Sequence, residues 1–294
     1  MTTFIANTII GLSLGGIFAL AALGIVLVYR VTGVLNFANG AMGMFSTFVA
    51  WDVFFHRTHQ NFWLSLIAGL LFSVVLGLAL QWAVFYWLAG RTQLIKAVVT
   101  IGVLLVLQAG ASLIWGNTQY HVPIAIPNGD AVFSVAGAPV SFNHVLIIVV
   151  AIALAAGLAV FLRLTKVGIA MRAVSEDVDT SRIWGVPVGL VGSISWVMGS
   201  AVAALAGILI TPFINFDTIS MTLLVLDALA AALIGGLVSL PLTVVGGFAL
   251  GLFETYPHAL IPGLSLGFSK VVAIVVILAV LLLRRQSALV GRQA

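Results

Sequence analysis

Long apolar runs separated by short polar stretches occupy almost the whole chain. A helix needs about 20 apolar residues to cross the roughly 30 Å hydrocarbon core of a bilayer. The runs of suitable length are 4–28, 34–55, 62–89, 94–116, 144–162, 190–212, 220–239, 242–257 and 263–283. Because the run 242–257 is short and begins beside Pro241, the pattern predicts about eight or nine transmembrane helices. The predicted fold class is an all-α integral membrane protein, a polytopic bundle forming a single domain over residues 1–294.

The span 34–55 differs from a plain apolar helix in its first half, which contains Asn36, Asn39, Gly40 and Gly43. Irregular backbone at membrane depth is tolerated only where it is buried in protein or lines a water-filled cavity. We therefore expect this span to be broken or re-entrant. The residues expected to line or gate a pathway are Asn36, Phe37, Asn39 and Gly40. A notch for close helix packing is an equally open alternative.

The few basic residues predict how the spans are oriented. Of the twelve Lys and Arg residues, Lys270 lies within the last span and Arg57 is the exception expected on the outside. The other ten lie after the first span, at the junction 90–96, in the stretch 163–189 or in the tail: Arg30, Arg91, Lys96, Arg163, Lys166, Arg172, Arg182, Arg284, Arg285 and Arg292. Cytoplasmic loops are enriched in Lys and Arg, so these segments and the C-terminus are expected in the cytoplasm. The N-terminus is then outside with nine crossings and inside with eight.

The segment 117–143 contains no Lys or Arg and is expected to be an extracytoplasmic loop. Its Asn-Gly-Asp turn signal at 128–130 and its apolar alternation favour short strands in a small cap over the bundle. A disordered connector is the alternative.

Composition narrows the function. The chain is 62% hydrophobic and 7% charged, whereas soluble domains are about 25% charged, so lipid is the expected solvent. The net charge of +4 forms no basic stripe, and no nucleic-acid partner is expected. The chain has no cysteine, no G-x-x-x-x-G-K-[ST] motif and no His and carboxylate cluster at ligand spacing. We therefore expect no catalytic residues, no metal site and no enzymatic activity.

The ionisable residues within predicted spans include Asp227, Lys270 and Glu254, with Asp52 near an interface. Asp227 lies in mid-span and Lys270 lies in the last full span. A charge at bilayer depth costs at least about 2.5–3.5 kcal/mol on insertion scales, so such residues are functional candidates by default. A structural Asp227–Lys270 ion pair and a role in transport are equally open.

The hydrophilic stretch 163–189 separates two spans and is predicted to form one short amphipathic helix at the membrane surface. Arg172 and Glu176 stand four residues apart and can pair, and Gly185 with Pro187 is expected to end the helix. Such a helix could transmit motion from a soluble partner into the bundle.

Four strings give the chain a family resemblance. Gly168-x-x-x-Arg172-Ala173-x-x-Glu176-Asp177, followed by Gly185-Val186, resembles the cytoplasmic coupling loop of ABC-transporter permeases of the branched-chain amino acid (Liv) type. The strings 11–24, 35–40 and 230–241 are similar to the opening segments and the later glycine-rich pair of that family. The four occur in the family's order.

The resemblance implies the permease subunit of an ATP-driven importer in the bacterial inner membrane, for branched-chain or related amino acids, amides or urea. It implies a second permease subunit (a paralogue), two cytoplasmic ATP-binding subunits and an extracytoplasmic solute-binding protein. This chain would then need no cofactor of its own, since its partners use the ATP. The residues implied in coupling to the ATPase are Gly168, Arg172, Ala173, Glu176, Asp177 and Gly185. A stand-alone secondary transporter or channel for small polar solutes is the alternative.

Overall fold

The computed structural model describes residues 2–57, 61–88, 90–120, 132–135, 138–214, 217–260, 271–280 and 282. In chain order the elements are α1 (Thr2–Thr32), α2 (Asn39–Asp52), the π-helical turn η1 (Val53–Arg57), α3 (Phe62–Leu80), the π-helical turn η2 (Gln81–Phe85), α4 (Gln93–Trp115), β1 (Val132–Val135), β2 (Ala138–Ser141), α5 (Phe142–Leu164), α6 (Lys166–Glu176), α7 (Val178–Ile183), α8 (Val188–Ile210), α9 (Thr218–Ile234) and α10 (Leu240–Leu260). A further helix covers Val271–Val280.

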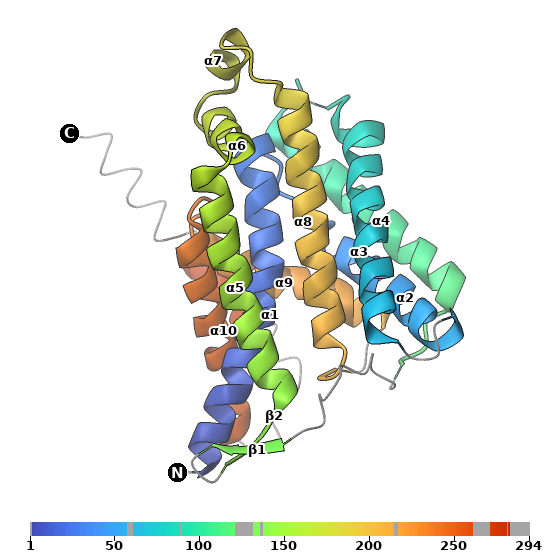
Figure 1. The fold of residues 1–294 in the computed structure, drawn as a ribbon, viewed down its shortest axis with the longest axis vertical. Coiled ribbons are helices and arrows are strands. Elements are labelled where there is room, and N and C mark those ends of the chain that lie inside the picture. Colours follow the sequence, from blue (N-terminus) through green and yellow to red (C-terminus); the bar gives the residue numbers. More distant parts are fainter. Residues whose placement is uncertain are drawn as a thin grey trace, which may run out of the picture.

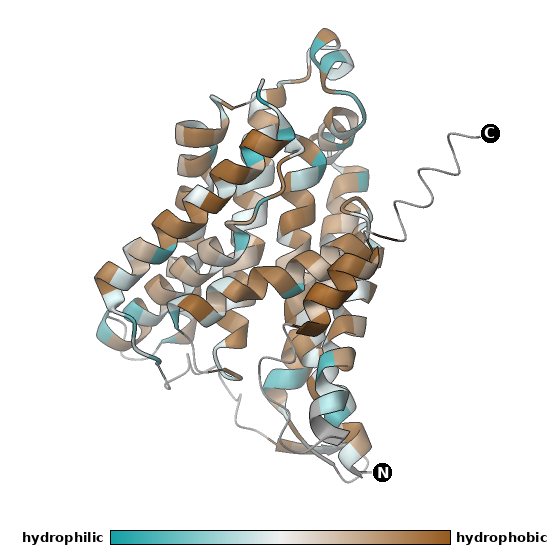
Figure 2. Cartoon of the chain, turned by 180° about the vertical axis from the view of Figure 1, so that it is seen from behind, coloured by the Kyte–Doolittle hydropathy of each residue, from teal (hydrophilic) through white to brown (hydrophobic). Residues whose placement is uncertain are grey.

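The predicted all-α membrane fold is confirmed. The described helices that are long and apolar enough to cross a membrane are Thr3–Thr32, Phe62–Phe85, Gln93–Trp115, Phe142–Leu164 and Val188–Ile210. The helices Thr218–Ile234 and Val271–Val280 are shorter and also apolar. Apolar residues cover the length of the bundle, and hydrophilic residues gather toward its two ends (Figure 2). The total of eight or nine crossings stays a prediction.

The helices form an inner and an outer group. The most apolar windows of α1 and α8 are 78% and 72% buried, whereas those of α3, α4 and α5 are only 22%, 11% and 22% buried. α1 packs against α10, α8, α9 and α5 and forms the centre of the bundle (Figure 1). The outer helices direct large apolar side chains away from the protein, such as Leu113 of α4, which is 87% exposed. These faces suit contact with lipid chains.

Glycines bring α1 and α10 into backbone contact. A Cβ atom on Gly15 would lie 2.7 Å from the carbonyl oxygen of Gly247, and one on Gly251 would collide with the backbone of Gly11 and Gly15. Small residues spaced by four allow this approach in a membrane, where no hydrophobic effect drives helices together. The pair Gly11 and Gly15 of α1 and the pair Gly247 and Gly251 of α10 thus pack against each other.

The two ends of the bundle carry different structures. The N-terminal end of α1 lies beside an antiparallel hairpin in which Val132 pairs with Ser141, and α6 and α7 lie at the opposite end (Figure 1). The hairpin confirms the predicted strands within 117–143, of which 121–131 and 136–137 lie outside the described residues. We name these the hairpin end and the α6–α7 end. The described basic residues of the α6–α7 end are Arg30, Arg91, Lys96, Arg163, Lys166, Arg172 and Arg182.

The α1–α10 contact predicts a test of packing. Gly251→Leu should destabilise the purified chain by about 1–3 kcal/mol or more, because the side chain must push two backbones apart. Thermal unfolding in detergent measures the loss. Gly102→Leu is the matched control, since nothing lies within 4 Å of a Cβ atom at that exposed position of α4. Equal unfolding midpoints for the two variants would contradict the proposed contact.

Candidate functional site

After α1 the chain turns back into the bundle as an irregular segment. α1 ends at Thr32, Gly33 has a φ of +65°, and α2 begins only at Asn39. The Asn39 side chain donates from Nδ2 to the carbonyl oxygen of Ala21 at 3.1 Å. Ala21 lies about 16 Å along α1 from its end at Thr32, at 1.5 Å per residue. The start of α2 is therefore deep in the bundle, and the predicted break in the span 34–55 is present.

Thr100 of α4 holds the irregular segment in place. Its buried hydroxyl accepts from the backbone N–H of Phe37 at 3.3 Å. The single hydroxyl proton is shared between the carbonyl oxygens of Ala97 at 2.7 Å and Leu35 at 3.1 Å. Thr100 thus pairs backbone groups of the irregular segment, as membrane depth requires. Thr100 was not among the predicted site residues, because no local pattern distinguishes it from other hydroxyl residues of the spans.

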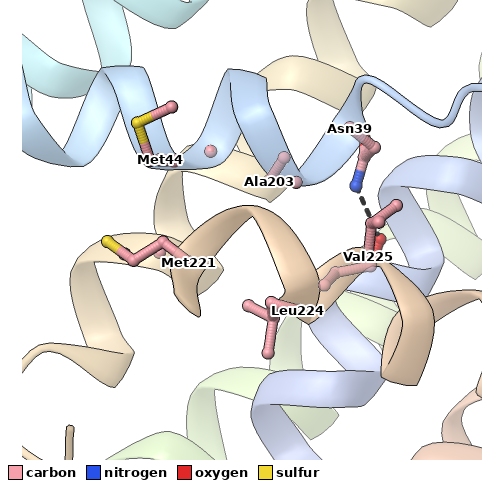
Figure 3. A pocket seen from close by; sticks show the side chains of 10 residues that line it. Asn39, Met44, Ala203, Met221, Leu224 and Val225 are labelled. Atoms are coloured by element: carbon pink, nitrogen blue, oxygen red, sulfur yellow. Dashed lines mark hydrogen bonds between the residues drawn. The ribbon is translucent and has the colours of Figure 1, made fainter. Parts of the chain in front are cut away.

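A small cavity lies where α2, α8 and α9 meet, and it is lined by Asn39, Met44, Ala203, Met221, Leu224 and Val225, among others (Figure 3). Its volume is about 10 Å³, at the lower limit for one water molecule. A Cβ atom on Gly40 would lie 2.5 Å from the carbonyl oxygen of Thr222. In this conformation Gly40 is a packing residue, and nothing larger than water fits beside it.

The four predicted pathway residues lie together at the start of α2, but they are buried to different extents. Asn36 and Asn39 are 2% and 1% exposed, and the Oδ1 atom of each has no hydrogen-bond partner among the residues that the structure describes. Phe37 is half-buried and packs on the apolar core. The chain thus places two unsatisfied amide oxygens near the start of α2, which could accept from a polar solute.

Of the predicted intramembrane charges, Asp227 is fully buried in α9. Glu254 of α10 is 3% exposed. Lys270 lies outside the described residues, so an Asp227–Lys270 pair stays a prediction.

The segment 163–189 forms two helices, and the prediction of one continuous helix was wrong. Asp177 interrupts it in extended conformation and caps α7, accepting from the Thr180 backbone N–H at 2.7 Å. This hydrogen bond lowers the pKa of the Asp177 carboxyl, because it favours the charged form. α7 is followed by Gly185, whose φ is +78°, and Pro187 precedes α8, so the predicted end of the helical segment is correct.

The predicted coupling residues fall into two groups. Gly168 and Arg172 face the bundle: a Cβ atom on Gly168 would collide with the end of α5, and Arg172 lies against Arg30 of α1. The structure has no ion pair between Arg172 and Glu176, both of which it describes, so that expectation was wrong. The residues that line an open groove of about 190 Å³ include Ala173, Glu176, Asp177 and Trp184.

The tip of this segment is apolar and exposed. Ile183 is 85% exposed and Trp184 is 82% exposed, and α7 projects beyond the ends of the long helices (Figure 1). Large exposed apolar groups beside polar ones mark interaction surfaces. We name Glu176, Asp177, Ile183 and Trp184 the α7 tip. The Ile-Trp pair within a hydrophilic stretch was the sequence signal for it, and it was missed.

Trp184 is expected to contribute nothing to folding. Trp184→Ala should change the free energy of unfolding by no more than about 0.5 kcal/mol, as exposed substitutions usually do. Trp196→Ala should cost about 3–5 kcal/mol, because Trp196 is fully buried and its ring stacks on Phe85 at 4.3 Å. Chemical unfolding of both variants in detergent measures the difference. A large loss for Trp184→Ala would mean that the tip is packed in solution.

Comparison with known proteins gives one family. The family described as the permease component of branched-chain amino acid transport systems matches residues 7–281. The high-affinity branched-chain amino acid transport system permease protein LivH of Escherichia coli K12 is 28% identical, over 95% of this chain and 93% of its own. BraD of Pseudomonas aeruginosa is 28% identical, over 86% of each chain. A probable branched-chain amino acid transport permease protein LivH of Methanocaldococcus jannaschii is 29% identical, over 91% of this chain and 86% of its own. No solved structure matches the chain significantly.

Proposed function

The chain belongs to the family of branched-chain amino acid transport system permease components, and we propose that it forms the translocation pathway of an ATP-driven importer. The proposed solutes are branched-chain or related amino acids, amides or urea. The relatives LivH and BraD, named for branched-chain amino acid transport, support the first of these. The proposed location is the bacterial inner membrane, with the α6–α7 end and the C-terminus in the cytoplasm. The concentration of basic residues at that end supports this orientation.

The α7 tip is proposed as the docking site for a cytoplasmic ATP-binding subunit. The observation that carries this proposal is the exposure of Ile183 and Trp184 on a helix that stands clear of the bundle. Tryptophan is enriched among the residues that dominate binding energy at protein interfaces. The carboxylates of Glu176 and Asp177 beside it would select a partner surface with basic residues.

The segment is also built to transmit force. Gly168 fixes α6 against α5 at close range, and α7 leads through Gly185 and Pro187 directly into α8. A push on α7 would therefore reach the long helices without passing through a flexible loop. The remaining proposed partners are a second permease subunit, a second ATP-binding subunit, and a solute-binding protein at the hairpin end.

Substitutions at the α7 tip test the docking proposal. Trp184→Ala should weaken association with the ATP-binding subunits that co-purify with the wild-type chain by about thirtyfold, the equivalent of roughly 2 kcal/mol. Glu176→Lys should also weaken this association, because it replaces a negative charge with a positive one that repels a basic partner surface. Asp177→Ser should bind better than Asp177→Lys, because serine keeps the cap of α7.

The matched control is Trp63→Ala, which removes a 63% exposed tryptophan at the start of α3, away from the α6–α7 end. Quantitative mass spectrometry of the purified complexes is the measurement. Wild-type binding and solute uptake in the Trp184→Ala and Glu176→Lys variants would overturn the docking proposal and favour a transporter that works alone.

The start of α2 is proposed to gate the pathway. The irregular backbone at 33–38 and the unsatisfied Asn36 and Asn39 oxygens support this role. The cavity beside them is closed, so a second conformation would have to separate α2 from α9 to admit solute.

Cysteine scanning tests the gate, because the chain contains no cysteine. Asn36→Cys and Asn39→Cys should resist a polar thiol reagent in one nucleotide state of the complex and react at least about tenfold faster in the other, as solvent access to the thiol changes. Ser195→Cys, fully buried in α8, is the control that should resist in both states. If the two asparagine positions behave like the control throughout, the gate lies elsewhere.

A further inference from the structure

A third cavity lies at the α6–α7 end and takes no part in the roles assigned so far. It occupies about 530 Å³ between the end of α1, η2, the start of α4, α7 and the start of α8. This volume falls within the usual range of about 300–1,000 Å³ for small-molecule sites. The lining residues include Thr32, Gln81, Tyr86, Lys96, Arg182 and Gly189.

The charge of this cavity is positive. Lys96 of α4 and Arg182 of α7 face it from elements that are remote in sequence, and none of its described lining residues is Asp or Glu. Asp179 forms a salt bridge with Arg182 at 3.3 Å, and the two side chains are 88% and 58% exposed. An ion pair this exposed is weak, so Asp179 neutralises the charge of Arg182 only partly. Two cations converging on one cavity favour an anion with several acceptor oxygens, such as a phosphate.

Gln81 supplies the complementary hydrogen-bonding group. It is 8% exposed and begins η2, where α3 changes from α-helical to π-helical winding, a change that often marks functional sites. Its Oε1 atom has no hydrogen-bond partner within the described chain. A buried acceptor of this kind requires a donor, such as a hydroxyl group on the same ligand.

The position of the cavity indicates a lipid. Tyr86 lines it and is 53% exposed, so the cavity reaches the outer surface of the bundle. Trp82 and Trp87, on the same turn, are 57% and 75% exposed. Exposed Trp and Tyr residues gather at the level of the lipid headgroups. The exposed apolar face of α4 that includes Val98 then continues toward the acyl chains.

We propose that this cavity binds the headgroup of an anionic phospholipid, its phosphate on Lys96 and Arg182 and a headgroup hydroxyl on Gln81. Basic pockets between transmembrane helices on the cytoplasmic side are known to take such headgroups. The bound lipid joins α4 to α7 and so holds the α7 tip in position. The site is independent of the docking proposal, because a lipid can bind here whether or not an ATP-binding subunit docks.

The test is native mass spectrometry of the full chain released from nanodiscs of phosphatidylglycerol or of phosphatidylcholine. We expect one retained phosphatidylglycerol per chain and little phosphatidylcholine. Lys96→Gln and Arg182→Gln should each reduce retention about fivefold and together about thirtyfold, at roughly 1 kcal/mol per cation. Lys166→Gln and Arg163→Gln remove exposed cations at the same end outside the cavity and should leave retention unchanged.

A second pair of variants separates occupancy from charge. Gly189→Leu should block the site without disturbing packing, because nothing lies within 4 Å of a Cβ atom there; Gly157→Leu, equally open on α5, is its control. Equal retention of both lipids, or retention unaffected by all three cavity variants, would overturn the proposal. Displacement of the lipid by millimolar glycerol phosphate would also overturn it, since the site would then hold a soluble anion.

Discussion

The close contact of α1 with its neighbours is the constraint on which the rest of the structure depends. In a bilayer, helices gain little by hiding apolar surface from one another, so association relies on packing and on hydrogen bonds. Gly11 and Gly15 admit α10, and a Cβ atom on Gly24 would lie 2.8 Å from the carbonyl oxygen of Gly199 on α8. α1 is consequently surrounded by protein over most of its length, and α3, α4 and α5 are left to face lipid.

A central α1 explains the break that follows it. The chain emerging at Thr32 returns into the bundle beside α1, and it does so first as irregular backbone. Irregular backbone at this depth needs partners from another element, and Thr100 of α4 supplies hydrogen bonds to Leu35 and Phe37. Gly40 then lets α2 approach α9 at Thr222. The unusual composition of the 34–40 stretch is thus explained by packing and hydrogen bonding together, and its two asparagine oxygens are buried without a hydrogen-bond partner among the described residues.

The sequence predicted structure well where the lipid solvent determines which positions are apolar. Apolar runs placed the long helices to within a few residues, because each must match the thickness of the membrane. The helix end at Gly185 and Pro187 was also readable, since it depends on a local steric requirement. The division of 163–189 into two helices was not readable, because no local pattern distinguishes Asp177, the exposed acid that caps α7, from the other charged residues of the stretch. The inward direction of Arg172 and the convergence of Lys96 with Arg182 depend on tertiary contacts that no local pattern encodes.

α8 connects the cationic cavity, α7 and the closed cavity beside Asn39. Its first turns line the cationic cavity at Gly189 and Gly192, and it follows directly on α7. About 16 Å further along, at 1.5 Å per residue, Ala203 lines the closed cavity beside Asn39. Between them, Gly199 meets Gly24 of α1 at backbone distance, and Ala203 and Gly207 meet Gly43 of α2 equally closely. α8 therefore joins the cavity at the α6–α7 end to the packed start of α2 by continuous close contact.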